Sequence, residues 1–313
     1  MTLRGHLWTV APHLLQRFRR DGDPHARPWT TVLEDPTVGQ VRLSGFLHEP
    51  VGARALLVVV HGLGGSASSH YAVRAARAAK AAGLACLRLS LRGADGSGED
   101  FYNAGLTEDL RAAVESPEAR RYEAVLVLGY SLGGHLTLRY AVEQPDPKVR
   151  AVAAVCAPLD LKLSQEAIDR PGLALYRHYL LGNLRRLMAA VEAGRELPVP
   201  LSVLRTVRTL REWDRQTVVP RFGFASPEDY YARASVGPHL ARLRMPALLV
   251  AAEADPMVPP AALRPSLTAE HGALKVRWVS RGGHVGFPAD LDLGFAASPG
   301  LESQVLAWLQ ARL

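Results

Sequence analysis

One serine of this chain is enclosed by glycines at a junction between a strand-like and a helix-like segment. The stretch Gly129-Tyr130-Ser131-Leu132-Gly133 follows an apolar run and precedes a helical pattern. This spacing is typical of a nucleophile elbow, a sharp turn that exposes the serine hydroxyl, with small flanking residues because strand and helix pack closely. The pattern alone is expected by chance in about one chain in ten of this composition. The prediction of an elbow therefore depends largely on the position of this motif between a predicted strand and a predicted helix.

A serine hydroxyl needs a base to remove its proton, and a carboxylate to orient that base. After an elbow of this kind the acid comes next in the chain and the histidine last. The histidines downstream of Ser131 are His135, His178, His239, His271 and His284. We expect His284 to be the base, because it lies in the glycine-rich loop "SRGGHVGF" directly after a predicted strand. His135 lies one turn along the helix that follows the serine, and we expect it to be a packing residue.

The acid is expected after the preceding strand, in "LLVAAEADPMVPP". Asp255 has the best position there, and Glu253 is the alternative. Asp160, in "APLD", also follows a predicted strand and stays open, although it is equally suited to capping a helix N-terminus.

An oxyanion hole needs two N–H donors, one from the residue after the nucleophile and one from the loop after the third strand. Leu132 and Leu63 are the predicted donors. The second loop reads "HGLGG", and its glycines, beginning with Gly62, let the backbone bend toward the serine.

The same loop allows a rival interpretation. The run 62–67 also fits G-x-G-x-x-A, a dinucleotide-binding pattern, and Arg88 and Arg92 could then accept the 2′-phosphate of NADP. This alternative leaves Ser131, Asp255 and His284 unexplained, and it places the fingerprint on the third strand rather than the first. We find no metal-binding motif and no phosphate loop, so we expect neither a metal nor a cofactor.

The elements that position these residues alternate along most of the chain. Strands are expected over 29–34, 41–48, 54–62, 84–90, 123–129, 149–157, 245–255 and 274–280, with helices over 69–83, 107–116, 131–144, 259–272 and 301–313. This alternation predicts an α/β fold with a mostly parallel central sheet flanked by helices. Over about 160–240 the apolar residues recur at spacings of three and four, which predicts the amphipathic helices of an inserted cap. We therefore expect a single domain over 1–313 with this cap.

Composition excludes several classes of protein. Of the 313 residues, 48% are hydrophobic and 21% charged, as in an ordinary globular protein. No apolar run approaches the roughly 20 residues of a membrane span, and no signal peptide is recognised, so a cytoplasmic location is expected. The net charge of +7 is spread along the chain. We expect no nucleic-acid partner, although peripheral contact with lipid stays open. Cys86 and Cys156 are expected to be free thiols in the core.

Taken together, several motifs resemble one family. They are "VVHGLGGSASSHY", "LRGADGSG", "NAGLTEDL", "LGYSLGGH", "APLDL", "REWDRQTVVPRFGF", "DYYARAS", "AEADPMVPP" and "GGHVGF". The chain resembles the YheT-like branch of the α/β-hydrolase superfamily, relatives of the ABHD serine hydrolases. The resemblance implies an α/β-hydrolase fold with a helical insertion, a triad carried onto Ser131, Asp255 and His284, and hydrolysis of acyl or lipid-like carboxylic esters. The acid loop departs from the pattern, since relatives often carry a second acidic residue before the aspartate.

From these residues we expect a serine hydrolase that acts on a small-molecule acyl ester without a cofactor. An apolar pocket between cap and sheet would favour short to medium acyl chains. The same triad could serve a thioesterase, an amidase or an acyltransferase, because fold and triad do not fix the substrate. The oligomeric state cannot be predicted from these motifs.

Overall fold

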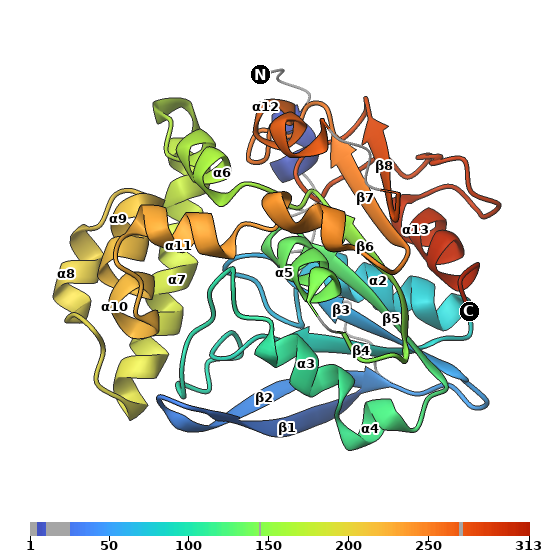
Figure 1. Cartoon of the computed structure of the whole chain (residues 1–313), viewed down its shortest axis with the longest axis horizontal. Helices are drawn as coiled ribbons and strands as arrows, with labels where there is room; N and C mark the ends of the chain where they lie inside the picture. Colours follow the sequence, from blue (N-terminus) through green and yellow to red (C-terminus); the bar gives the residue numbers. More distant parts are fainter. Residues whose placement is uncertain (1–4, 11–25, 144, 269–271) are drawn as a thin grey trace.

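An eight-stranded sheet forms the centre of the molecule (Figure 1). The computed structural model describes residues 5–10, 26–143, 145–268 and 272–313. The strands are β1 Arg27–Asp35, β2 Gly39–His48, β3 Ala55–Val60, β4 Ala85–Ser90, β5 Ala124–Tyr130, β6 Val149–Val155, β7 Ala247–Ala252 and β8 Leu274–Val279. They lie in the order β1-β2-β4-β3-β5-β6-β7-β8. β2 is antiparallel to both β1 and β4, and all other neighbours are parallel. The predicted α/β architecture is confirmed.

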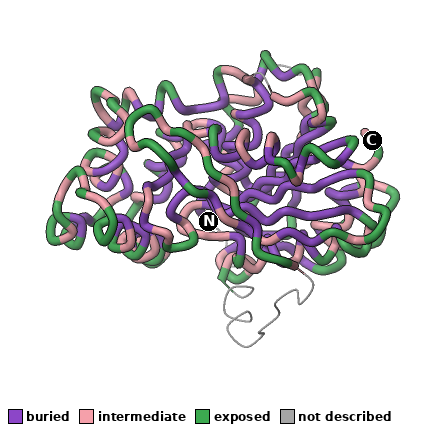
Figure 2. Tube along the Cα trace, turned by 90° about the horizontal axis from the view of Figure 1, so that it is seen from below, coloured by how far each residue is buried: buried purple, intermediate pink, exposed green. Residues whose placement is uncertain are grey.

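Helices cover both faces of this sheet. The six residues of β3 are all buried and apolar, as expected of a strand with a packed layer on each side. Leu57 and Val59 point to the face covered by α2 His70–Ala81 and α13 Leu301–Gln310. Leu56, Val58 and Val60 point to the other face, where α3 Glu108–Val114, α4 Pro117–Arg120 and α5 Leu132–Val142 pack. Figure 2 shows this buried centre enclosed by partly and fully exposed segments.

The segment between β6 and β7 forms helices, as predicted, and we call residues 161–242 the cap. It comprises α6 Leu161–Ile168, η1 Pro171–Leu173, α7 Ala174–Gly194, α8 Leu201–Thr206, α9 Leu210–Gln216, α10 Val218–Phe222, α11 Pro227–Ala234 and η2 Gly237–Arg242. The helices α7 to α11 lie beside the sheet, at the left of Figure 1. The helices α8 to α11 are short because of local signals. Gly223 ends α10 in a left-handed conformation, and Ser226 caps α11 ahead of a proline.

The prediction of one helix over 259–272 is wrong. The chain forms α12 Pro260–Leu263 and then a 3-10 turn, η3 Arg264–Leu267. Pro265 has no backbone N–H to donate, which breaks the helical hydrogen-bond pattern there. His271, one of the histidines considered above, lies outside the described residues.

Buried ion pairs join the cap to the sheet. The Arg92 side chain, after β4, is fully buried and pairs with Asp109, Asp35 and Asp100 at 2.7, 2.7 and 3.0 Å. Arg221 of α10 reaches the same site and pairs with Asp100 at 2.7 Å. Because buried charges need partners, loss of Arg92 would leave the buried Asp109 carboxylate without its ion-pair partner. This cluster fixes α10 against the end of β1.

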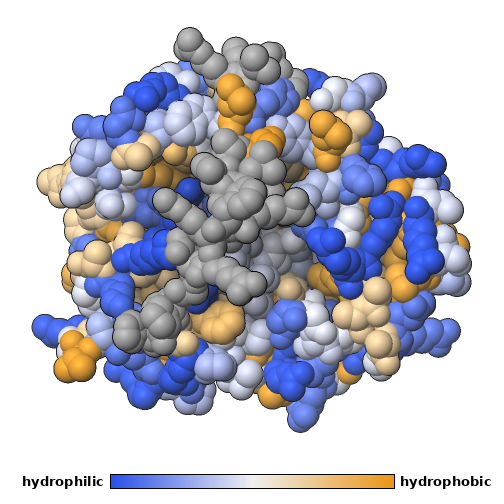
Figure 3. All heavy atoms as spheres, turned by 180° about the vertical axis from the view of Figure 1, so that it is seen from behind, coloured by the Kyte–Doolittle hydropathy of each residue, from blue (hydrophilic) through white to orange (hydrophobic). Residues whose placement is uncertain are grey.

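On the face seen in Figure 3, hydrophilic residues predominate and smaller hydrophobic groups lie between them. None of the described helices combines the length and the apolar character that crossing a bilayer requires.

Candidate active site

Ser131 occupies the turn between β5 and α5. Its backbone angles, φ 52° and ψ −120°, lie in a region that residues other than glycine rarely adopt. The flanking glycines permit this turn through close backbone approach. A Cβ atom on Gly129 would lie 2.1 Å from the carbonyl oxygen of Gly133, and one on Gly133 would lie 2.4 Å from the carbonyl oxygens of Val60 and His61. The glycines predicted to flank the elbow are thus required sterically.

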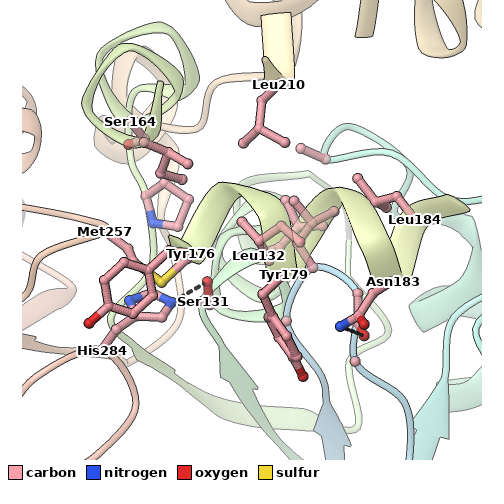
Figure 4. Close-up of a pocket in the computed structure, with 18 of the residues that line it drawn as sticks. Ser131, Leu132, Ser164, Tyr176, Tyr179, Asn183, Leu184, Leu210, Met257 and His284 are labelled. Carbon is pink, nitrogen blue, oxygen red and sulfur yellow. Dashed lines mark hydrogen bonds between the residues drawn. The ribbon is translucent and has the colours of Figure 1, made fainter. Parts of the chain in front are cut away.

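The structure brings three of the predicted site residues into hydrogen-bonding contact. Nε2 of His284 lies 2.8 Å from Oγ of Ser131, and its Nδ1 lies 2.9 Å from Oδ2 of Asp255. Because a carboxylate only accepts, Nδ1 carries the proton of the neutral ring and Nε2 is free to accept from the serine hydroxyl. The Asp255 and His284 side chains are almost completely buried. Figure 4 shows the serine and the histidine facing each other.

Asp255 is held by its own loop. Its Oδ1 accepts hydrogen bonds from the backbone N–H groups of Met257 and Val258 at 2.8 and 3.0 Å. These bonds orient the carboxylate toward His284. The two alternative acids have other positions. Glu253 is exposed, and Asp160 caps α6 by accepting from the N–H of Leu163.

The side chains of the other described histidines downstream of the serine form no hydrogen bond with it. His135 is fully buried, and its two ring nitrogens face the carbonyl oxygens of Pro158 and Ala234 at 2.8 and 2.9 Å. It therefore joins α5 to the end of α11, in keeping with the expected packing role. His178 is exposed on α7, and His239 is half-buried in η2.

The backbone N–H groups expected to bind an oxyanion lie beside the serine. In the loop after β3, the N–H groups of Gly62, Gly64 and Gly65 donate to Tyr71, Tyr102 and the Gly62 carbonyl. Within the described chain no acceptor is bonded to the N–H of Leu63 or of Leu132. Both leucines line the same cavity as Ser131.

Helical residues 5–10 contact both the loop of Asp255 and the loop of His284. Thr9 Oγ1 accepts a 2.9 Å hydrogen bond from the backbone N–H of His284 and donates to the Gly5 carbonyl at 2.8 Å. A Cβ atom on Gly5 would lie 1.9 Å from the carbonyl oxygen of Ala254, and one on Gly283 would lie 2.3 Å from that of Gly5. This short segment is therefore wedged between the two loops.

A pocket of about 960 Å³ opens at Ser131 and extends under the cap. Its wall is mostly apolar and includes Leu132, Leu184, Leu210 and Met257. In Figure 4, α7 passes beside Ser131, and its labelled side chains, which include Tyr176 and Tyr179, lie along the pocket. Asn183 Nδ2 donates to the carbonyl oxygen of Gly64 at 3.0 Å, which joins α7 to the loop after β3.

Two further groups near the site are uncharged. His61 Nδ1 donates to the Gly62 carbonyl while Nε2 accepts from the N–H of Leu91, and burial lowers the pKa of His61 to about 4. Cys156, with φ 51°, follows β6, and its Sγ lies within 4.8 Å of the Asp255 and His284 ligand atoms. Burial and the nearby Asp255 carboxylate raise the pKa of the Cys156 thiol well above its usual range, so it remains protonated. Cys86, in β4, is also buried and is not part of a disulfide.

The arginines of the dinucleotide-binding alternative are used within the fold. Arg92 is enclosed by its three carboxylates. Arg88 Nη1 donates to the carbonyl oxygen of Ala67 at 2.9 Å, and its guanidinium lies over the Phe46 ring. Both side chains are buried, so neither is presented to a phosphate.

Some residues of the site carry no signal that we recognised in the sequence. Thr9 and Tyr176 lie outside any catalytic motif, and their positions depend on how distant segments meet. Asp214, which lines the pocket, and Tyr231, whose hydroxyl donates to it, lie in "REWDRQTVVPRFGF" and "DYYARAS". Those motifs supported the family resemblance, but no role was predicted for either residue.

Comparison with known proteins agrees with this architecture. The model of the alpha/beta hydrolase family matches residues 57–296. The Escherichia coli protein YheT is 31% identical, over 98% of this chain and 91% of its own. The human phospholipase ABHD3 is 24% identical, over 80% of this chain and 64% of its own. Among solved structures, the Pyrococcus furiosus esterase Pf2001 superposes with a TM-score of 0.53 at 15% identity, over 83% of this chain and 84% of that one.

The match to the family model spans most of the sheet and both loops that meet the elbow, and the YheT match extends over nearly the whole chain. These findings confirm the resemblance inferred from the motifs. The chain belongs to the alpha/beta hydrolase family, in the branch that includes YheT and the ABHD3 phospholipases.

Proposed function

We propose that this chain is a serine hydrolase that cleaves carboxylic esters through a catalytic triad of Ser131, His284 and Asp255. The observation that carries the proposal is the continuous chain of hydrogen bonds from Ser131 Oγ through His284 to the Asp255 carboxylate. The names of relatives support the ester substrate, since they include an esterase, a monoacylglycerol lipase and a phospholipase.

In the proposed reaction, His284 Nε2 removes the Ser131 proton as Oγ attacks the ester carbonyl carbon. The N–H groups of Leu63 and Leu132 stabilise the resulting oxyanion, and each such donor typically contributes about 3 kcal/mol. The imidazolium gives its proton to the departing alcohol oxygen, which leaves an acyl-enzyme. Asp255 stabilises the imidazolium throughout. A water molecule, activated by His284, then releases the acid and restores the serine.

We infer from the pocket that the substrate has an apolar acyl part of short to medium length or a lipid-like one. The cap, residues 161–242, supplies much of the apolar wall and would act as a lid over the bound chain. An enclosed apolar wall favours alkyl groups by about 0.8 kcal/mol for each buried CH₂. Charged short-chain substrates gain nothing from such a wall.

Peripheral contact with lipid also forms part of the proposal. Leu7, Val10, Leu175 and Tyr179 are exposed, and the last three line the pocket. Apolar side chains at a pocket mouth suit a lipid surface. A vesicle sedimentation assay would show weaker binding for Leu175→Glu, whereas Val51→Glu, an exposed change in the loop after β2, would bind like the wild type. Equal binding by both variants would contradict the lipid contact.

A fluorophosphonate probe tests the nucleophile. We expect the wild-type protein and Ser202→Ala, which alters an exposed serine of the cap, to be labelled equally, and Ser131→Ala to remain unlabelled. A series of p-nitrophenyl esters of increasing chain length, with His284→Ala as the control, then tests the reaction. Labelling of Ser131→Ala at the wild-type level, or no hydrolysis at any chain length, would refute the proposed function.

A further inference from the structure

The apolar pocket contains one carboxyl group that the proposed reaction does not use. Asp214 lies on α9, and its neighbours on the pocket wall include Leu210, Trp213 and Val218. Its side chain is half-buried and borders the pocket. A carboxyl group in such surroundings is costly unless its hydrogen-bonding capacity is used.

The protein satisfies this carboxyl only in part. The Tyr231 hydroxyl of α11 donates to Oδ2 of Asp214 at 2.7 Å. Within the described chain no donor is bonded to Oδ1, and no ion pair includes Asp214. The other acidic group acting on it is Asp169, which lies at the end of α6 and accepts from the backbone N–H groups of Leu210 and Arg211. One oxygen of Asp214 is therefore left for a ligand.

The chemistry of this oxygen indicates the kind of ligand. Burial, with a smaller contribution from the Asp169 charge, raises the pKa of Asp214 to about 7. Near neutral pH much of the group is therefore protonated, and a protonated carboxyl can both donate and accept. A hydroxyl group has the same two capacities. A plain alkyl chain packed against the carboxyl would leave its second oxygen, Oδ1, without a partner, which costs about 1–3 kcal/mol for a buried polar atom.

We propose that Asp214 and Tyr231 form a polar subsite of the cap that binds a hydroxyl group carried by the substrate away from the scissile ester. The proposal rests on the proposed function and extends it. The substrate class becomes an ester with an apolar chain that bears a hydroxyl group. An ammonium group is the competing ligand. Among the described residues that line the pocket, Asp214 is the only acidic one, so an ammonium group would find a single carboxyl there and no second anion.

The test compares p-nitrophenyl esters that carry a hydroxyl group at successive positions of the acyl chain with the unsubstituted ester of the same length. For the wild type we expect kcat/KM to be about tenfold higher for at least one hydroxy ester, as one hydrogen bond provides. In Asp214→Leu this ratio should fall to one or below. Tyr231→Phe, which removes a single hydroxyl, should lower the ratio in part.

Glu228→Leu is the matched control, because it removes an exposed carboxylate of the cap that does not line the pocket. It should keep the wild-type ratio. Equal ratios in the wild type and Asp214→Leu, or no hydroxy ester preferred at any position, would overturn the subsite. A preference of the wild type for the chain ending in a trimethylammonium group would overturn the choice of a hydroxyl ligand. Hydrolysis of the unsubstituted esters reports on the proposed function separately, and its absence in the wild type would refute both proposals.

Discussion

The half-buried Asp214 carboxyl should make the stability of this protein fall as the pH rises. Its pKa is raised from 3.8 to about 7 in the folded state. The folded chain therefore binds this proton more tightly than the unfolded chain. Its stabilising effect is complete below pH 3.8 and is lost as the pH rises through about 7. The shift corresponds to about 4 kcal/mol, of which roughly 2.5 kcal/mol is lost between pH 5 and pH 8.

Asp214→Asn isolates this effect, because asparagine keeps the shape and accepts from Tyr231 but does not ionise. Urea unfolding at pH 5 and pH 8 should show that the free energy of unfolding falls by roughly 2.5 kcal/mol more in the wild type than in the variant. Asp290→Asn, at an aspartate whose side chain is 66% exposed, is the control and should follow the wild type. Parallel changes in the wild type and Asp214→Asn would refute the assignment of a buried, proton-binding carboxyl.

Three further variants test the geometry of the site. Asp255→Asn should lower kcat for ester hydrolysis by about 10³–10⁴-fold with little change in KM, because the amide no longer holds His284 in the tautomer that accepts the serine proton. A loss of kcat under tenfold would contradict this role of Asp255. Thr9→Val removes the acceptor of the His284 backbone N–H, so kcat should fall about tenfold, whereas kcat of Thr9→Ser should stay near the wild-type value. Equal kcat values for the two variants would exclude a role of Thr9 in positioning His284. Gly133→Ala places a Cβ atom 2.4 Å from the His61 carbonyl oxygen. Thermal unfolding should show that the free energy of unfolding falls by several kcal/mol, and an unfolding transition like that of the wild type would contradict the close packing.

The sheet and the elbow could be predicted because each depends on a local pattern. Continuous apolar runs indicate strands with helices on both sides, and every predicted strand is found with ends shifted by a few residues. The positions of Asp255 and His284 follow from the same rule, since the ends of parallel strands meet at one edge of the sheet. Chain order and strand position are therefore sufficient to predict where both residues lie.

The fragmented cap and the contacts of residues 5–10 could not be predicted in the same way. Amphipathic periodicity indicated helices over about 160–240, but it does not specify how short helices pack on one another. The contacts of Thr9 with His284, and of Asp214 with Tyr231, join segments far apart in sequence or helices in different orientations. Such pairs depend on the tertiary fold, and a single sequence carries no periodic signal for them.

The residues on the loops of the sheet and the residues of the cap differ in what they determine. Ser131, His284 and Asp255 lie on loops of the sheet, where backbone geometry allows little variation, as the positive φ values of Ser131, Cys156 and Val285 indicate. Much of the pocket wall comes from the cap helices, α7 above all, whose side chains can differ without disturbing the elbow. In the proposed function, the loops of the sheet therefore carry the bond-breaking chemistry and the cap selects the substrate. Asp214 is the cap residue that we assign to substrate selection, because its carboxyl borders the pocket and only one of its two oxygens is bonded to another described residue, Tyr231.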